Sequence, residues 1–135
     1  MPVVTDQGLV GRVDAVISSA ARIQLITDTG SAVNVRIEKA DREAILVGTV
    51  AGDLALDMIP QEIKLEPGDV VLTSGLGGGY PTDLIVGQIL TARKRDSDLF
   101  QQATVQPVVD FEQLKIVLII TDFRPVDITP LIPAP

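Results

Sequence analysis

The sequence predicts an all-β protein of two small packed β-barrels, with about nine short strands and little helix. Short stretches rich in Val, Ile and Leu recur along the chain, and several alternate apolar with polar residues, as half-buried strands do. Turn signals separate these stretches about every 8 to 12 residues, a spacing typical of a β-sandwich or barrel. A connector between two groups of strands favours two barrels over a single sheet.

The composition of this chain of 135 residues limits which residues can form its core and which kinds of functional site it can hold. Apolar residues make up 46% of it and aromatic residues only 3%, so the core is built from Val, Ile and Leu. The absence of Cys and His excludes disulfides, thiolate metal sites and a Ser-His-Asp triad. A net charge of -7 argues against a nucleic-acid partner, because phosphates demand a basic face. No apolar run approaches the roughly 20 residues of a transmembrane helix, and no signal peptide is visible.

Five strands are predicted in the first half of the chain. A turn at residues 28–31 (DTGS) and a charged, solvated hairpin tip at residues 38–43 (EKADRE) separate three of them. The strands are expected at residues 9–17, 21–27, 32–37, 44–50 and 53–59. Their alternation predicts inward side chains in the first, second, third and fifth strands, at Leu9, Val13, Ala15, Ile17, Ile23, Leu25, Val33, Val35, Ile37, Leu54, Leu56 and Met58.

Four more strands are predicted in the second half, at residues 70–73, 84–92, 103–109 and 116–120. Residues 93–98 (RKRDSD) form a charged, solvated hairpin end. Pro107 predicts an edge or bulged strand, because proline cannot donate to a strand ladder. Asp110 is placed to cap one helical turn over residues 110–115. The last strand is continuously apolar, which predicts cover on both faces.

The connector at residues 60–67 predicts the division into domains. The first β-barrel is expected over residues 1–60 and the second over residues 61–123. Residues 124–135 contain four prolines and are expected to form an extended, poorly ordered tail.

A glycine loop lies between the strands predicted at residues 70–73 and 84–92. Gly75, Gly77, Gly78 and Gly79 give a backbone that could cradle a phosphate, cover a substrate or join two strands. No Lys follows the glycines as in a P-loop, and nothing in the loop is basic. The simplest interpretation is that this loop only connects two barrel strands.

Asp28-Thr29-Gly30 after an apolar stretch is the local signature of an aspartic protease, and a retroviral-type enzyme would use one such motif per subunit as a homodimer. The same three residues also make a common β-turn. A second Asp-Thr-Gly is absent from the chain, and Ser74 has no histidine to activate it. The remaining carboxylates are scattered without metal-ligand spacing.

Several ordered motifs resemble those of one known family. Residues 7–13 (QGLVGRV), 25–28 (LITD) and 66–79 (EPGDVVLTSGLGGG) are similar to segments of the MreC family of bacterial rod shape-determining proteins. Leu99-Phe100-Gln101 and the turn at residues 110–114 add to the resemblance, which spans residues 3 to about 121. Thr29-Gly30 and Thr82-Asp83 depart from the usual family pattern.

The resemblance implies a non-enzymatic scaffold of the cell-elongation complex, without a cofactor. It implies a class B penicillin-binding transpeptidase, MreD, RodA and MreB as partners, and self-association into a homo-oligomer or filament. The full-length protein would be membrane-anchored with its β-domains on the extracytoplasmic face. This chain would then be a soluble fragment whose first barrel lacks early strands.

The candidate partner-binding residues are Gly77, Gly78, Gly79, Tyr80 and Pro81. Tyr80 is the only tyrosine of the chain, and it stands at the end of the glycine loop. The alternative is that Tyr80 only caps a barrel, as lone aromatic residues often do. Many Val, Ile and Leu residues also suit pairing through exposed strand edges.

Overall fold

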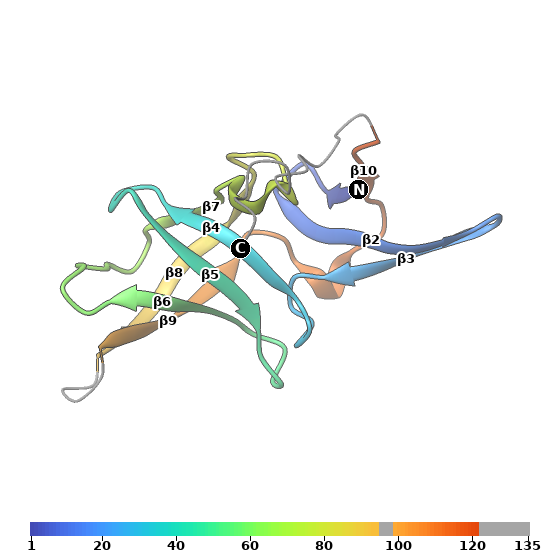
Figure 1. Ribbon diagram of the computed structural model, residues 1–135. Coiled ribbons are helices and arrows are strands. Elements are labelled where there is room, and N and C mark those ends of the chain that lie inside the picture. Colours follow the sequence, from blue (N-terminus) through green and yellow to red (C-terminus); the bar gives the residue numbers. More distant parts are fainter. Residues whose placement is uncertain (95–98, 122–135) are drawn as a thin grey trace.

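The computed structural model describes residues 1–94 and 99–121, and it confirms the all-β class. Six strands form a closed barrel, and four strands form a separate sheet beside it (Figure 1). Beyond the strands, the described residues contain two single-turn 3-10 helices, η1 at Leu76–Gly78 and η2 at Phe111–Gln113. None of the described helices has the length and apolar character needed to cross a membrane.

The barrel is an antiparallel closure of the middle of the chain, in the order β4-β5-β6-β9-β8-β7. Its inward residues are mostly Val, Ile and Leu, and fifteen buried side chains form its core cluster. The periodicity of the third predicted strand is confirmed, because Val33, Val35 and Ile37 are all buried. The strands are β4 (Ala32–Ile37), β5 (Arg42–Gly48), β6 (Leu54–Pro60), β7 (Val70–Thr73), β8 (Ile85–Arg93) and β9 (Phe100–Pro107).

The four-stranded sheet is assembled from both ends of the described chain, in the order β10-β1-β2-β3. Its own core is small, with only Val3, Val10 and Val109 buried in a cluster among the described residues. The sequence prediction missed its first strand, which is three residues long. The strands are β1 (Pro2–Val4), β2 (Leu9–Ile17), β3 (Ala20–Leu25) and β10 (Leu118–Ile119).

Strand β2 of the sheet contributes side chains to both cores. Leu9 belongs to the barrel core, whereas its neighbour Val10 belongs to the core of the sheet. This follows from the period of a strand, which sends successive side chains to opposite faces. Phe111 packs against both clusters. The two units are therefore joined by side chains as well as by the backbone.

The structure divides the chain differently from the predicted ranges 1–60 and 61–123. Strand β6, which ends at Pro60, and strand β7, which follows the connector, belong to the same barrel. The connector between them is held in place by the buried Gln101, whose Nε2 donates to the carbonyls of Pro60 (3.0 Å) and Ile63 (2.6 Å). Barrel closure and these bonds make residues 60–67 a loop of the barrel.

The predicted inward position of Met58 is wrong. Leu54 and Leu56 are buried as predicted, but Met58 is 52% exposed and Ile59 is buried instead. The pairing of β6 with β9 shifts register between Leu56 and Ile59, and Met58 has a φ of 65°. A β-bulge of this kind inserts a residue and reverses the faces beyond it.

The hairpin of β2 and β3 is only half packed. Every residue from Asp14 to Arg22 is exposed, including Ile17 at 67%. The predicted inward positions Ala15 and Ile17 are therefore wrong, although both are in a strand. The outer half of the hairpin projects beyond the sheet, where no other element covers it (Figure 1).

The segment after the barrel also differs from expectation. Asp110 caps the predicted turn, because its side chain accepts a hydrogen bond from the Glu112 backbone. The apolar stretch at residues 116–120 contributes only β10, and Ile116 (82%) and Leu118 (61%) are exposed. The predicted cover on both faces is therefore wrong among the described residues. Pro107 is the last residue of β9, where it interrupts no ladder.

Residues 95–98 and 122–135 lie outside the described residues. The charged loop predicted at residues 93–98 and the predicted proline-rich tail therefore fall mostly or wholly outside them.

A candidate groove between the sheet and the barrel

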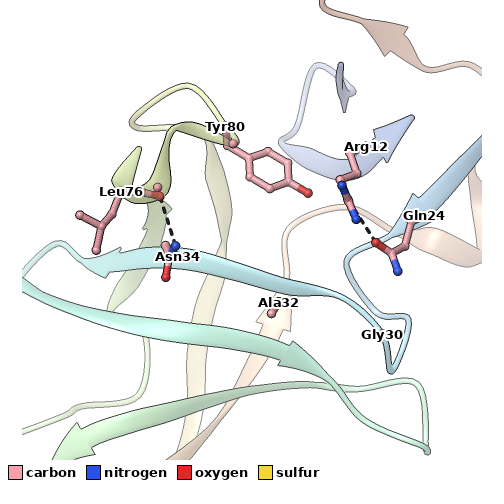
Figure 2. A pocket seen from close by; sticks show the side chains of 9 residues that line it. Arg12, Gln24, Gly30, Ala32, Asn34, Leu76 and Tyr80 are labelled. Carbon is pink, nitrogen blue, oxygen red and sulfur yellow. Dashed lines mark hydrogen bonds between the residues drawn. The ribbon is translucent and has the colours of Figure 1, made fainter. Parts of the chain in front are cut away.

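A groove of about 400 Å³ opens where the sheet meets the barrel, at the predicted glycine loop. Arg12 and Gln24 form the wall on the sheet side, and Asn34 of β4 forms part of the floor (Figure 2). Leu76, Gly77, Gly79 and Tyr80 of the glycine loop form the opposite wall. We call this feature the inter-unit groove.

The glycine loop takes its shape from positive backbone angles. Gly75 and Gly77 have φ values of 73° and 80°, a region that side chains disfavour. A Cβ at Gly75 would also lie 2.3 Å from the Cγ2 atom of Thr82. Asn34 holds the loop to β4, because its Nδ2 donates to the Leu76 carbonyl at 3.1 Å.

The far end of the loop is fixed by a buried hydroxyl. Thr73 is fully buried, and its Oγ1 donates to the carbonyl of Pro81 at 2.6 Å. The same oxygen accepts a hydrogen bond from the Leu84 backbone at 2.9 Å. Thr73 therefore holds the end of the glycine loop through two hydrogen bonds, and Asn34 holds its beginning.

Tyr80 both packs on the barrel core and lines the inter-unit groove. It is half-buried and packs against the barrel core, so part of its ring is structural. Its hydroxyl points across the inter-unit groove toward Arg12 (Figure 2). Burial raises the pKa of the Tyr80 hydroxyl, and the positive charge of Arg12 offsets part of that rise. The hydroxyl is therefore protonated at neutral pH and can donate a hydrogen bond.

Arg12 is presented by strand β2. Its Nε donates to Oε1 of Gln24 on β3 at 3.2 Å, across a directly paired position of the ladder. Its side chain is exposed, and no carboxylate in residues 1–94 or 99–121 lies within ion-pair distance of it. Four other basic residues, Arg22, Arg36, Lys39 and Lys64, are paired with carboxylates.

The glycines of the QGLVGRV segment allow the close contacts that position Arg12. A Cβ at Gly8 would lie 2.4 Å from the Ile85 carbonyl oxygen of the barrel. A Cβ at Gly11 would lie 2.0 Å from the carbonyl oxygen of Gln24 in the next strand. Both positions therefore require glycine, the first for packing against the barrel and the second for the hairpin.

Three of the five predicted site residues line the inter-unit groove, namely Gly77, Gly79 and Tyr80. Gly78 lies in η1, and Pro81 follows the groove and binds Thr73 through its carbonyl. Sequence reasoning missed Arg12, Gln24 and Asn34. Each is a polar residue on a strand, and only the packing of the sheet on the barrel brings them beside the loop.

The Asp28-Thr29-Gly30 segment forms the turn between β3 and β4. Asp28 is exposed, and its Oδ1 accepts a hydrogen bond from the Gly30 backbone at 3.1 Å. Its carbonyl accepts another from Ser31. These are the local bonds of an Asx turn. Among the described residues, no group of three or more Asp or Glu residues is placed to hold a metal ion.

The fold and the groove define an all-β protein that presents a recess between two packed units. Residues 1–121 match the family described as rod shape-determining protein MreC, barrel core. The chain belongs to this family, which confirms the resemblance of its motifs. The match is to a family of shape-determining proteins, which favours that hypothesis over the aspartic protease.

Relatives and solved structures agree with this assignment. The cell shape-determining protein MreC of Haemophilus influenzae is 30% identical over 120 residues, which is 88% of this chain. The crystal structure of MreC from Pseudomonas aeruginosa has a TM-score of 0.80 and 28% identity, and the match covers 86% of this chain and 76% of that one.

Two further solved structures show the fold alone, because their identities are low. One is MreC from Helicobacter pylori in a complex with the penicillin-binding protein PBP2, with a TM-score of 0.71 and 20% identity over 86% of this chain and 73% of that one. The other is described as the major periplasmic domain from the cell shape-determining filament MreC, with a TM-score of 0.66 and 22% identity over 81% and 69%. The present chain spans 34% of the length of its Haemophilus influenzae relative.

Proposed function

We propose that this chain is the partner-binding part of a scaffold for cell elongation, and that the inter-unit groove contacts a class B penicillin-binding transpeptidase. Membership of the MreC family carries the proposal. The complex of PBP2 with the Helicobacter pylori protein supports the class of partner. The proposal assigns no enzymatic activity to the chain.

The groove is proposed as the contact because it combines fixed walls with exposed apolar surface. Leu76 is 56% exposed on the glycine loop, and the half-buried ring of Tyr80 lines the same groove. Exposed aromatic and aliphatic side chains at the centre of an interface often carry much of its affinity. Gly78 and Pro81 then shape the loop, while Gly77, Gly79 and Tyr80 form the contact surface.

The proposed location is the extracytoplasmic face of the cell membrane, in the periplasm or cell-wall space. The structure described as a periplasmic domain of MreC supports this location. MreD, RodA and MreB are proposed as further associates of the whole assembly. Their contacts would be made by the longer protein within the membrane complex.

Self-association is the second part of the proposal. Strand β3 ends the order of the sheet, so one of its edges has no strand partner among the described residues. An exposed edge of this kind can pair with another chain. The description of a related structure as part of a filament supports self-pairing of this kind.

The decisive experiment measures binding of the full chain to the extracytoplasmic part of its transpeptidase by isothermal titration calorimetry. Leu76→Ser removes an exposed apolar side chain without opening the core, so it should weaken binding roughly tenfold. Val50→Ser is the matched control, because Val50 is 97% exposed on a barrel turn away from the groove. Equal binding by wild type and Leu76→Ser would reject the groove as the contact.

A further inference from the structure

Arg12 places a positive charge, unpaired among the described residues, at the inter-unit groove. Arg12 uses only its Nε in the contact with Gln24, and both terminal nitrogens have no hydrogen-bond partner among the described residues. The chain as a whole carries a net charge of -7, yet no described carboxylate pairs with this cation. A planar guanidinium with both terminal nitrogens available matches the geometry of a carboxylate.

The opposite wall supplies a second donor. The Tyr80 hydroxyl faces Arg12, and no hydrogen bond joins the two groups (Figure 2). A guanidinium can only donate, and a protonated tyrosine hydroxyl can also donate. Two donors that face each other across a recess can be satisfied together by an acceptor placed between them.

We infer that the inter-unit groove recognises a carboxylate, carried by an Asp or Glu side chain in a segment of the partner protein. Arg12 supplies the charge and two parallel donors, and Tyr80 adds a hydrogen bond from the other wall. Leu76 also lines the groove, so an acidic residue with an apolar residue nearby in the partner segment suits it. The inference rests on the proposed function for the identity of the partner.

The first test uses two peptide probes that differ in one charge. Acetyl-Leu-Gly-Glu-Gly-amide and acetyl-Leu-Gly-Gln-Gly-amide are titrated into the 15N-labelled full chain at low salt. We expect saturable shifts of the Arg12 Nε–H and of the amides around Tyr80 with the Glu peptide, and at least tenfold weaker binding of the Gln peptide. Equal binding of the two peptides, or shifts that do not involve the groove, would overturn the inference.

Variants separate recognition from general electrostatics. Arg12→Gln should reduce binding of the Glu peptide about tenfold, and Arg12→Lys should restore only part of it, because a lysine lacks the planar fork. Arg42→Gln is the matched control. Arg42 is exposed at the start of β5, so this substitution removes the same charge at a position away from the groove. An equal loss in Arg42→Gln would overturn the inference. The comparison of the two peptides on the wild type stands even if Arg12→Gln fails to fold.

The second test uses the transpeptidase and keeps the two proposals apart. If wild type binds it and Arg12→Gln binds at least about tenfold more weakly, with a loss that shrinks as salt is raised, both proposals are supported. If wild type binds it and Arg12→Gln binds equally well, the carboxylate contact is rejected while the proposed function stands. Absence of wild-type binding rejects the proposed function, and the peptide titration then decides the chemistry of the groove on its own.

Discussion

The barrel and the four-stranded sheet use similar residues but are stabilised to very different extents. Fifteen buried side chains fill the barrel, whereas three form the separate cluster of the sheet among the described residues. The barrel closes on itself and leaves no edge, while the sheet ends at β3 and extends into an exposed hairpin. The exposed outer half of this hairpin is a two-stranded ribbon, which is at best marginally stable alone, and the sheet behind it has only a small core. We therefore expect the sheet to depend on the barrel for its order.

The largest effect should come from the barrel core. Leu56→Ala removes a fully buried side chain and should lower the free energy of unfolding by about 2–5 kcal/mol. Val10→Ala, in the sheet, removes two methyl groups and should cost less, about 1.6 kcal/mol at roughly 0.8 kcal/mol per buried carbon. Urea unfolding followed by circular dichroism measures both. Equal losses would show that the sheet is as important to stability as the barrel.

The contact between the two units should rank second. Gly8→Ala places a Cβ against the Ile85 carbonyl and the Val108 side chain, so the sheet must shift and about 1–3 kcal/mol of stability should be lost. Hydrogen exchange should accelerate more in β1 and β2 than in the barrel. Gly79→Ala is the control, because its φ is -80° and no atom lies within 4 Å of the added carbon. Uniform acceleration over barrel and sheet would contradict a separable contact.

A smaller effect is expected from the ion pairs that hold the barrel connector. Lys39 and Lys64 bond to Glu66 at 2.8 and 3.4 Å, and both interactions lower the pKa of Glu66, Lys39 by more. A lowered folded-state pKa stabilises the protein above the ordinary value near 4.5, and this stabilisation is lost as pH falls through the lowered value. Thermal midpoints between pH 6 and pH 3 should therefore fall less steeply in Glu66→Gln than in wild type.

The matched control for that pH series is Glu43→Gln. Glu43 is exposed on β5, and it forms no ion pair with any described residue. Its pH profile should follow that of wild type. Parallel profiles for all three proteins would show that the pair of Lys39 and Glu66 contributes nothing to stability, as is common for exposed pairs.

The smallest effect on stability is expected in the projecting hairpin. Val16 and Ile17 are 63% and 67% exposed, so the double change Val16→Ser, Ile17→Ser should alter the free energy of unfolding by no more than about 0.5 kcal/mol. The same variant should weaken self-association in sedimentation experiments if the hairpin takes part in it. A loss of more than about 1 kcal/mol in a monomeric sample would mean that the hairpin is packed in solution.

The sequence predicted the barrel strands well because their local pattern and their environment agree. Val33, Val35 and Ile37 alternate in the sequence and are buried in the structure. The pattern failed at Met58 because a bulge reverses the faces, and at Ile17 because nothing covers that half of the hairpin. An alternation predicts which residues share a face, but the cover on that face depends on segments far away in the sequence.

The candidate site was half predictable for the same reason. The glycines and Tyr80 stand together in the sequence, so composition alone drew attention to them. Arg12 lies 68 positions before Tyr80 in the sequence. On its own strand it is an ordinary outward polar residue. Its place opposite Tyr80 depends on Gly8 and Gly11, which let the sheet approach the barrel and the hairpin close.

The anchoring of strand β2 in both cores has a consequence for how fast and how tightly a ligand can bind. Leu9 and Val10 are anchored in two different cores, and Arg12 follows only two residues later. Across the recess, Thr73 and Asn34 fix the loop that carries Tyr80. Neither wall needs to be ordered when a ligand arrives, so little conformational entropy is lost in the complex. Recognition at such a rigid recess is close to lock-and-key, and differences in affinity between ligands should appear mainly in their dissociation rates.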